Sequence, residues 1–168
     1  MLVIQMKKKV IILTILTVVF VLLDQLSKLL IISNYDVDTG FKVIPSFFSI
    51  VYVRNSGAAW GMFSDGTMLL ALISIVFLFF AIKYVVELKS INNFKVIQFS
   101  LLFGGIIGNL IDRLFRRYVV DFLSFKIFSY NFPVFNVADC FIVIAIILIF
   151  IEMIIDYKKS RGVRNDSK

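Results

Sequence analysis

The sequence has no histidine and a single cysteine, Cys140. Without histidine, neither a Ser-His nor a Cys-His catalytic relay can form, and the usual zinc ligand sets are absent. One cysteine also excludes a disulfide within the chain, and this thiol has no neighbouring lysine or histidine to activate it. We interpret Cys140 as a small packing residue. Chemistry in this chain must come from carboxylates, amines, amides or hydroxyl groups.

Apolar residues dominate what is present. The chain of 168 residues is 60% hydrophobic, and its mean hydropathy is +0.96. A soluble domain of this length cannot bury so much apolar surface. The composition therefore predicts an all-α polytopic membrane protein, with residues 1–168 forming one integral-membrane domain.

The net charge of +7 could suggest nucleic-acid binding, but the positions of the basic residues favour a membrane. They flank the apolar runs at both ends and at the middle connection: Lys7, Lys8, Lys9, Lys83, Lys89, Lys95, Lys158, Lys159, Arg161, Arg164 and Lys168. This distribution is an orientation signal for membrane insertion. No basic stripe is interleaved with aromatic residues, as single-strand binding surfaces require, so no nucleic-acid partner is expected.

Four apolar segments are long enough to cross a bilayer as helices: about 10–32, 67–86, 96–114 and 137–155. A cleaved signal peptide is the alternative for the first segment. That segment lacks a small-x-small cleavage site, so we interpret it as a retained helix. Four spans place both termini on one side, and the basic ends indicate the cytoplasm.

Two longer segments, about 33–66 and 115–136, then lie outside the membrane. The first contains "FKVIPSFFSIVYVRNSGAAWGMF", which is rich in β-branched and aromatic residues and ends its alternation near 55–57. This pattern predicts two or three short strands that form a small β-cradle. We expect the second segment to be a loop or a helix.

The acidic residues fall at two depths when each helix rises about 1.5 Å per residue. One group lies near the outer face: Asp24, Asp112, Asp121 and Asp139. The other group lies near the inner face: Glu87, Glu152 and Asp156. Since intramembrane carboxylates are costly, their convergence from separate segments at the outer face indicates a functional site.

Two of these motifs also have a purely structural explanation. In "DQLSK", Asp24 and Lys28 are four residues apart and can form an ion pair on one helix face. In "FPVFNVAD", Asn136 is a good helix N-cap, and Asp139 three residues later completes a capping-box pattern.

The motif "GGIIGNLIDRLFRR" combines packing and polar features. Gly104 and Gly108 form a small-xxx-small face that permits close helix packing. The polar residues recur at three- and four-residue spacing and share one flank: Asn109, Asp112, Arg113 and Arg116. Pairing of Asp112 with Arg113 or Arg116 would make a salt-bridged helix end, which explains Asp112 well but Asn109 poorly.

Two carboxylates that approach closely cannot both ionise cheaply, so they share a proton and titrate as a pair. One can then act as a base on water while the other acts as an acid toward the substrate. Such a pair hydrolyses an amide without histidine, cysteine or metal. The sequence alone does not establish that Asp121 and Asp139 meet.

Taken in order, the motifs "DQLSK", "RNSGAAWG", "GGIIGNLIDR", "VVDF" and "FPVFNVAD" resemble the lipoprotein signal peptidase family, signal peptidase II. The resemblance implies a catalytic pair of Asp121 and Asp139. It also implies supporting or substrate-binding roles for a second set: Asp24, Lys28, Asn55, Asn109, Asp112, Arg113 and Asn136.

The implied activity is that of an aspartic endopeptidase in the bacterial cytoplasmic membrane, with its active site at the outer face. It would cut prolipoproteins on the N-terminal side of a diacylglyceryl-modified cysteine. We expect no metal or cofactor, membrane lipids as further partners, and a monomer. Two alternatives are a small proton- or ion-coupled transporter and a non-catalytic scaffold. Transporters place acids near the midplane and often contain repeats, whereas these acids gather at one face.

Overall fold

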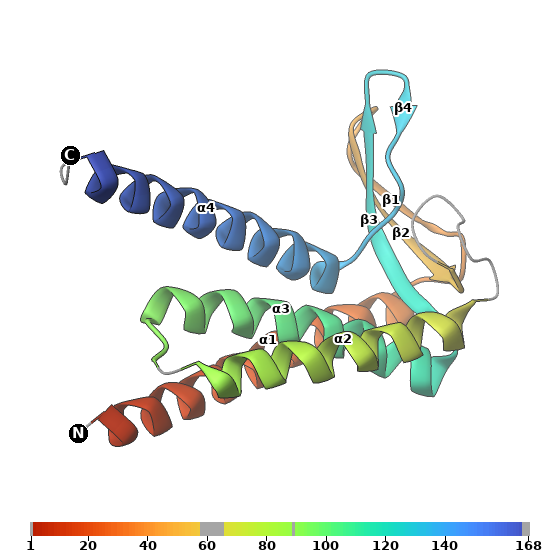
Figure 1. The fold of residues 1–168 in the computed structure, drawn as a ribbon. Helices are drawn as coiled ribbons and strands as arrows, with labels where there is room; N and C mark the ends of the chain where they lie inside the picture. The colour runs from red at the N-terminus through yellow and green to blue at the C-terminus, as the bar shows by residue number, and fades with distance from the viewer. Residues whose placement is uncertain (1, 58–65, 89, 166–168) are drawn as a thin grey trace.

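The computed structural model describes residues 2–57, 66–88 and 90–165, and contains a helix bundle and a small sheet (Figure 1). The helices are α1 (Leu2–Asn34), α2 (Thr67–Glu87), α3 (Asn93–Ile111) and α4 (Val137–Asn165), and a π-helical turn, η2 (Asp112–Arg116), extends α3. Positions 58–61 of the "RNSGAAWG" motif lie outside the described residues.

All four helices are long and apolar enough to cross a membrane. Their outward faces carry large apolar side chains that are about half exposed, including Leu30, Phe79 and Phe150. Such a surface is unsuited to water and suited to lipid. The four expected spans therefore correspond to helices, although α1 begins before residue 10 and α4 continues beyond residue 155.

Helix α3 lies at the centre of the bundle, where it packs against α1, α2 and α4. Its glycines allow this close approach. A Cβ atom on Gly104 would lie 2.5 Å from Cβ of Phe20 in α1, and one on Gly108 would lie 2.5 Å from a carboxylate oxygen of Asp24. Gly105 lies equally close to the backbone of α4 at Ala138. The predicted glycine face thus brings α1 near the polar end of α3.

The sheet is antiparallel, with strand order β1-β2-β3-β4. Its strands are β1 (Gly40–Ile44), β2 (Phe48–Asn55), β3 (Val119–Ile127) and β4 (Tyr130–Asn131). The first outer segment supplies β1 and β2, as predicted. The second supplies β3 and β4 and is not the expected loop or helix, because β3 obtains its hydrogen-bond partners from β2, far away in the sequence.

The sheet stands at the end of the bundle opposite to both chain ends (Figure 1). Its base is fixed by an apolar cluster that joins Ile31 of α1 to Tyr52 of β2 and to Val120 and Phe122 of β3. Side chains alternate along β3, so Asp121 points to the opposite face from its two neighbours. That opposite face looks toward the first turn of α4.

Candidate functional site

The site begins at the first turn of α4, where the predicted capping box is present. The backbone N–H of Asp139 donates to Oδ1 of Asn136 at 3.0 Å, and the N–H of Asn136 donates back to Oδ2 of Asp139 at 3.1 Å. Two N–H groups that the helix itself cannot pair are thereby satisfied. The cap also fixes the Asp139 carboxylate, because Oδ2 of Asp139 accepts the backbone N–H of Asn136.

Asn136 connects this cap to the sheet. Its Nδ2 donates to Oδ1 of Asp121 at 2.6 Å and to Oδ1 of Asn109 at 3.1 Å. In turn, Nδ2 of Asn109 donates to Oδ1 of Asp139 at 2.8 Å. The two amides therefore link both carboxylates in one network, and Asn136 is completely buried. Asn109, which a salt-bridged helix end did not explain, has its partners here.

Asp121 lies on β3, not in a loop as expected, and is only 3% exposed. Its Oδ2 accepts a hydrogen bond of 2.8 Å from Asn55, whose own Oδ1 holds the N–H of Gly57 at 2.9 Å. Burial raises the pKa of Asp121 to about 7, and the nearby charge of Asp139 contributes in the same direction. The hydrogen bonds from Asn55 and Asn136 oppose this rise.

A buried ion cluster lies directly behind this network. Lys28, with a fully buried side chain, forms ion pairs with Asp24 at 2.8 Å and Asp112 at 3.0 Å. Its third bond goes to Oδ1 of Asn109 at 2.8 Å. The lysine thus uses all three of its donors, and one of them orients the amide that holds Asp139.

The two carboxylates of this cluster also fasten neighbouring elements. Asp24 accepts from the backbone N–H of Ala138 in α4 at 3.0 Å. Asp112 accepts from the backbone N–H of Val120 in β3 at 3.1 Å, and it pairs with Arg116. Of the two expected arginine partners, Arg116 is therefore the one used.

Gln25 is a member of this cluster that sequence reasoning missed. Its amide nitrogen donates to Asp24, to the carbonyl oxygen of Gly108 and to Asp112, and its oxygen accepts from Arg116 at 2.9 Å. A polar amide inside the apolar run beside Asp24 was the available signal.

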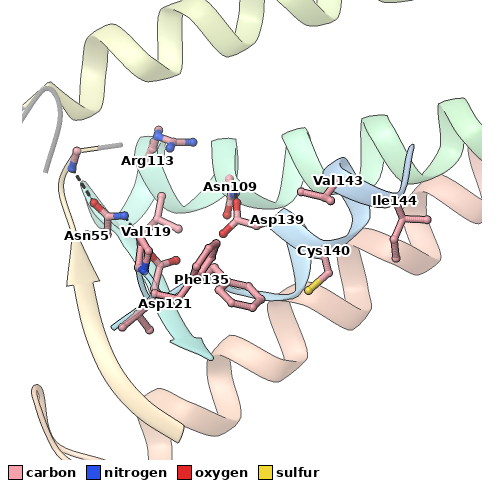
Figure 2. Close-up of a pocket in the computed structure, with 14 residues that line it drawn as sticks. Asn55, Asn109, Arg113, Val119, Asp121, Phe135, Asp139, Cys140, Val143 and Ile144 are labelled. Carbon is pink, nitrogen blue, oxygen red and sulfur yellow. Dashed lines mark hydrogen bonds between the residues drawn. The ribbon is translucent and has the colours of Figure 1, made fainter. Parts of the chain in front are cut away.

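Asp121 and Asp139 enter one cavity, of about 670 Å³, from β3 and from α4 (Figure 2). Its polar lining consists of Asn55, Asn109, Arg113, Asp121 and Asp139, together with the half-buried Cys140. Its apolar lining comes from β3, the segment before α4 and α4 itself: Val119, Phe132, Pro133, Val134, Phe135, Val143 and Ile144. The arrangement suits a substrate with a large apolar part and a polar reacting group.

Arg113 does not join the ion cluster, although Asp112 is adjacent to it. Its side chain lines the cavity, and its Nε is buried without a hydrogen-bond partner among the described residues. The nine predicted site residues thus separate into two groups. Asn55, Asn109, Arg113, Asp121 and Asp139 line the cavity, while the remaining four stand behind them: Asp24, Lys28, Asp112 and Asn136.

Four apolar helices and a cavity with paired carboxylates at one end define a multi-pass membrane protein with an enzyme-like site. Residues 16–155 match the family model described as signal peptidase (SPase) II. The chain therefore belongs to the signal peptidase II family. This membership implies a peptidase that removes lipoprotein signal peptides, and it does not favour the transporter interpretation.

Two solved structures are similar over most of the chain. One is a bacterial membrane enzyme determined by the in meso method at 2.3 Å resolution, with 37% identity and a TM-score of 0.80; the match covers 88% of this chain and 90% of that chain. The other, determined by the same method at 1.9 Å resolution, has 38% identity and a TM-score of 0.75 over 84% of this chain and 91% of that chain.

Replacing Lys28 with methionine should strongly destabilise the protein, because Asp24 would lose its cationic partner among the described residues and Asp112 would keep only Arg116. We expect a loss of about 3–5 kcal/mol, the usual cost of breaking a buried ion pair from one side. Lys83→Met is the matched control, since the Lys83–Glu87 pair is 59% and 65% exposed at 3.8 Å and should contribute at most about 1 kcal/mol. Thermal unfolding in detergent measures both, and equal losses would contradict the assignment.

Asp121→Asn should make stability less dependent on pH. Burial raises the pKa of the folded Asp121 carboxyl from an ordinary 3.8 to about 7. Between these pH values the folded protein keeps a proton that the same carboxyl has lost in the unfolded chain. Wild-type stability therefore falls as pH rises through this window, by about 4 kcal/mol at most from 1.36 kcal/mol per pKa unit.

The asparagine variant has no titrating carboxyl at this position, so its stability should not fall through this window. Unfolding midpoints measured between about pH 5 and pH 8 test the prediction. The exposed Asp36 provides the control variant, Asp36→Asn, whose curve should follow that of wild type. Parallel curves for wild type and Asp121→Asn would show that Asp121 does not hold the proton.

Proposed function

We propose that this protein is an aspartic endopeptidase that removes the signal peptide of prolipoproteins, cutting on the N-terminal side of a diacylglyceryl-modified cysteine. One observation supports it most directly. Asp121 and Asp139 come from a strand and a helix, are bridged by Asn136, and line one cavity beside a large apolar wall. The family match supports the same activity.

In the proposed mechanism Asp121 carries the proton of the pair near neutral pH, since burial raises its pKa to about 7. Asp139 then acts as the base. It takes a proton from a water molecule whose oxygen attacks the scissile carbonyl carbon. Asp121 protonates the reacting amide as the tetrahedral intermediate forms and collapses. The C–N bond breaks, the signal peptide leaves as a carboxylic acid, and the lipid-modified cysteine keeps a free amine.

The other site residues position this pair or the substrate. Asn55, Asn109 and Asn136 hold the two carboxylates through the hydrogen bonds described above. The Arg113 side chain lines the cavity, and its Nε has no hydrogen-bond partner within residues 2–57, 66–88 and 90–165. Its guanidinium is therefore suited to binding a substrate carbonyl oxygen or the charge that develops on it. The ion cluster acts indirectly. Lys28 orients Asn109, while Asp24 and Asp112 hold backbone N–H groups of α4 and β3.

The proposed setting is the bacterial cytoplasmic membrane, with both termini in the cytoplasm and the catalytic pair at the outer face. The basic residues at both chain ends support this orientation. A prolipoprotein is itself anchored by an apolar helix and by acyl chains, so its scissile bond would lie near the interface. The apolar wall from Phe132 to Phe135 and Val143 is suited to the lipid, and we propose that the protein acts as a monomer.

Asp121→Asn and Asp139→Asn should each lower kcat by at least about 100-fold, because each removes an acid or base needed in the transition state. The assay uses purified protein in detergent with a diacylglyceryl-modified prolipoprotein and follows release of the signal peptide. Asp36→Asn is the control and should cleave normally, because the Asp36 side chain is exposed in the connection between α1 and β1.

Three outcomes separate the hypotheses. Cleavage by wild type with loss in both variants supports the proposal, provided that both variants show a cooperative unfolding transition. Full cleavage by either variant would remove that residue from the catalytic pair. Failure of wild type to cleave the lipid-modified substrate would exclude the proposed activity and leave the scaffold interpretation.

A further inference from the structure

The first residue of α2 is joined to the end of β2, beside the catalytic candidates. Oγ1 of Thr67 donates to the carbonyl oxygen of Ser56 at 2.6 Å. Thr67 is only 6% exposed, so water cannot easily replace its hydroxyl as the donor to this carbonyl. The hydrogen bond therefore fixes the backbone at Ser56 relative to the start of α2.

Helix capping does not explain the hydroxyl of Thr67. A threonine at the N-cap accepts a hydrogen bond from a free backbone N–H group of its helix. In α2 the N-cap is Gly66, which forms no side-chain cap, and Thr67 is the first helical residue after it. The hydroxyl has one O–H to donate, and it donates to Ser56. This side chain thus serves the connection between α2 and β2.

Ser56 is the middle residue of a short turn, residues 55–57, that begins with Asn55. Nδ2 of Asn55 donates to Oδ2 of Asp121 at 2.8 Å, and its Oδ1 accepts the N–H of Gly57 at 2.9 Å. The bond from Gly57 determines which end of the amide faces Asp121 (Figure 2). Gly57 is itself buried and lines the cavity. The conformation of the turn therefore sets the hydrogen bond to Asp121.

The turn lies where the sheet ends. The backbone ladder between β2 and β3 finishes with the pair of Asn55 and Val119. A segment beyond the end of a ladder opens locally at low cost unless other contacts hold it. Thr67 provides such a contact from α2, which packs against α3 and η2. The turn is thus held between the sheet on one side and the helix bundle on the other.

We propose that Thr67 is a positioning residue for the reaction, whose hydroxyl holds the carbonyl group of Ser56 and thereby keeps the amide of Asn55 against Asp121. Thr67 lies outside the group of described residues that line the cavity, so it acts through Asn55 and not on the substrate. The inference rests on the proposed function, since it assumes that Asp121 is the acid of the reaction.

The proposal predicts a direction for the pH dependence. Burial raises the pKa of Asp121 to about 7, and the hydrogen bond from Asn55 opposes this rise. A less firmly held Asn55 should therefore let the pKa of Asp121 rise further. Because the acid must be protonated, the alkaline limb of kcat/KM should then move to higher pH. The other charged groups that act on Asp121 stay unchanged: Asp139 of α4, Lys28 of α1 and Arg113 of η2.

The test measures kcat/KM against pH for wild type and Thr67 variants, with the diacylglyceryl-modified prolipoprotein in detergent. Thr67→Val keeps the shape but removes the donor. It should raise the alkaline midpoint by about 0.5–1 pH unit and lower kcat about three- to ten-fold, as expected for one hydrogen bond, with KM unchanged. Thr67→Ala removes the same hydroxyl without a second methyl group against Ser56 and should shift the midpoint equally. Thr67→Ser keeps the hydroxyl and should retain the wild-type profile.

Thr17→Val is the matched control, because Thr17 of α1 is also buried, at 8% exposed, and its Oγ1 has no partner within the described part of the chain. Its profile should equal that of wild type. The double variant Asn55→Ala/Thr67→Val tests the route. Its midpoint should equal that of Asn55→Ala alone, since the hydroxyl then has no amide to position.

Unfolding midpoints measured against pH give the same test without a substrate. Since the pKa of Asp121 is higher in the folded protein, stability falls as pH rises until the folded pKa is passed. In Thr67→Val and Thr67→Ala this fall should continue to a higher pH than in wild type. If wild type does not cleave the substrate, the proposed function fails, while the unfolding curves still decide whether Thr67 acts on Asp121.

An unmoved midpoint in both Thr67→Val and Thr67→Ala would overturn the inference, even if kcat fell, because a merely structural role lowers activity without changing the pH profile. An equal displacement by Thr67→Ser or by Thr17→Val would also overturn it, since the hydroxyl of Thr67 would then not be responsible. A further displacement in the double variant, beyond that of Asn55→Ala, would show that Thr67 acts by a route other than Asn55.

Discussion

The structure depends on one buried ammonium group. Lys28 is fully enclosed between Asp24 and Asp112, and such a triad contributes little net stability unless every donor and acceptor is satisfied. Gln25 and Arg116 bind the two carboxylates from the side. The other partners are backbone N–H groups of α4 and β3 and the amide of Asn109. Each of them belongs to a different element. The cost of burying the charges is therefore offset only when α1, α3, α4 and the sheet assemble in one arrangement.

That requirement explains why the catalytic candidates can be held where they are. In a membrane, helices gain little from burying apolar surface against each other, so packing of small residues and polar contacts determine the geometry. Gly108 allows α1 to approach, the triad then fixes Asn109, and Asn109 with Asn136 fixes Asp139 and Asp121. Hydrogen bonds thus connect the ion cluster to two side-chain amides, and these amides to the pair of carboxylates in the cavity.

Much of this arrangement could be predicted from local patterns. Apolar length predicted the four helices, alternation predicted β1 and β2, and the capping pattern of Asn136 and Asp139 is present as expected. What could not be predicted were pairings between distant segments. β3 is a strand because β2 pairs with it, and no local signal contains that partner. Gln25 had a local signal, a polar amide inside an apolar run, but its partners Gly108, Asp112 and Arg116 are distant in the sequence. The placement of Asp121 opposite Asp139 came from a family resemblance instead of the residues alone.

The position of Asp121 costs the folded protein stability. A carboxyl group on a buried strand face, next to a second carboxylate, is disfavoured in its charged form, and its pKa rises to about 7. The amides of Asn55 and Asn136 reduce this cost without removing it, since they hydrogen-bond the group but carry no charge. A cation in their place would have stabilised the fold more and kept the carboxyl ionised. With neutral partners the proton stays available near neutral pH, which is the property that acid catalysis of amide hydrolysis requires. Lys28 lies behind Asn109, where its charge stabilises the assembly and makes only a small contribution that lowers the pKa of Asp121.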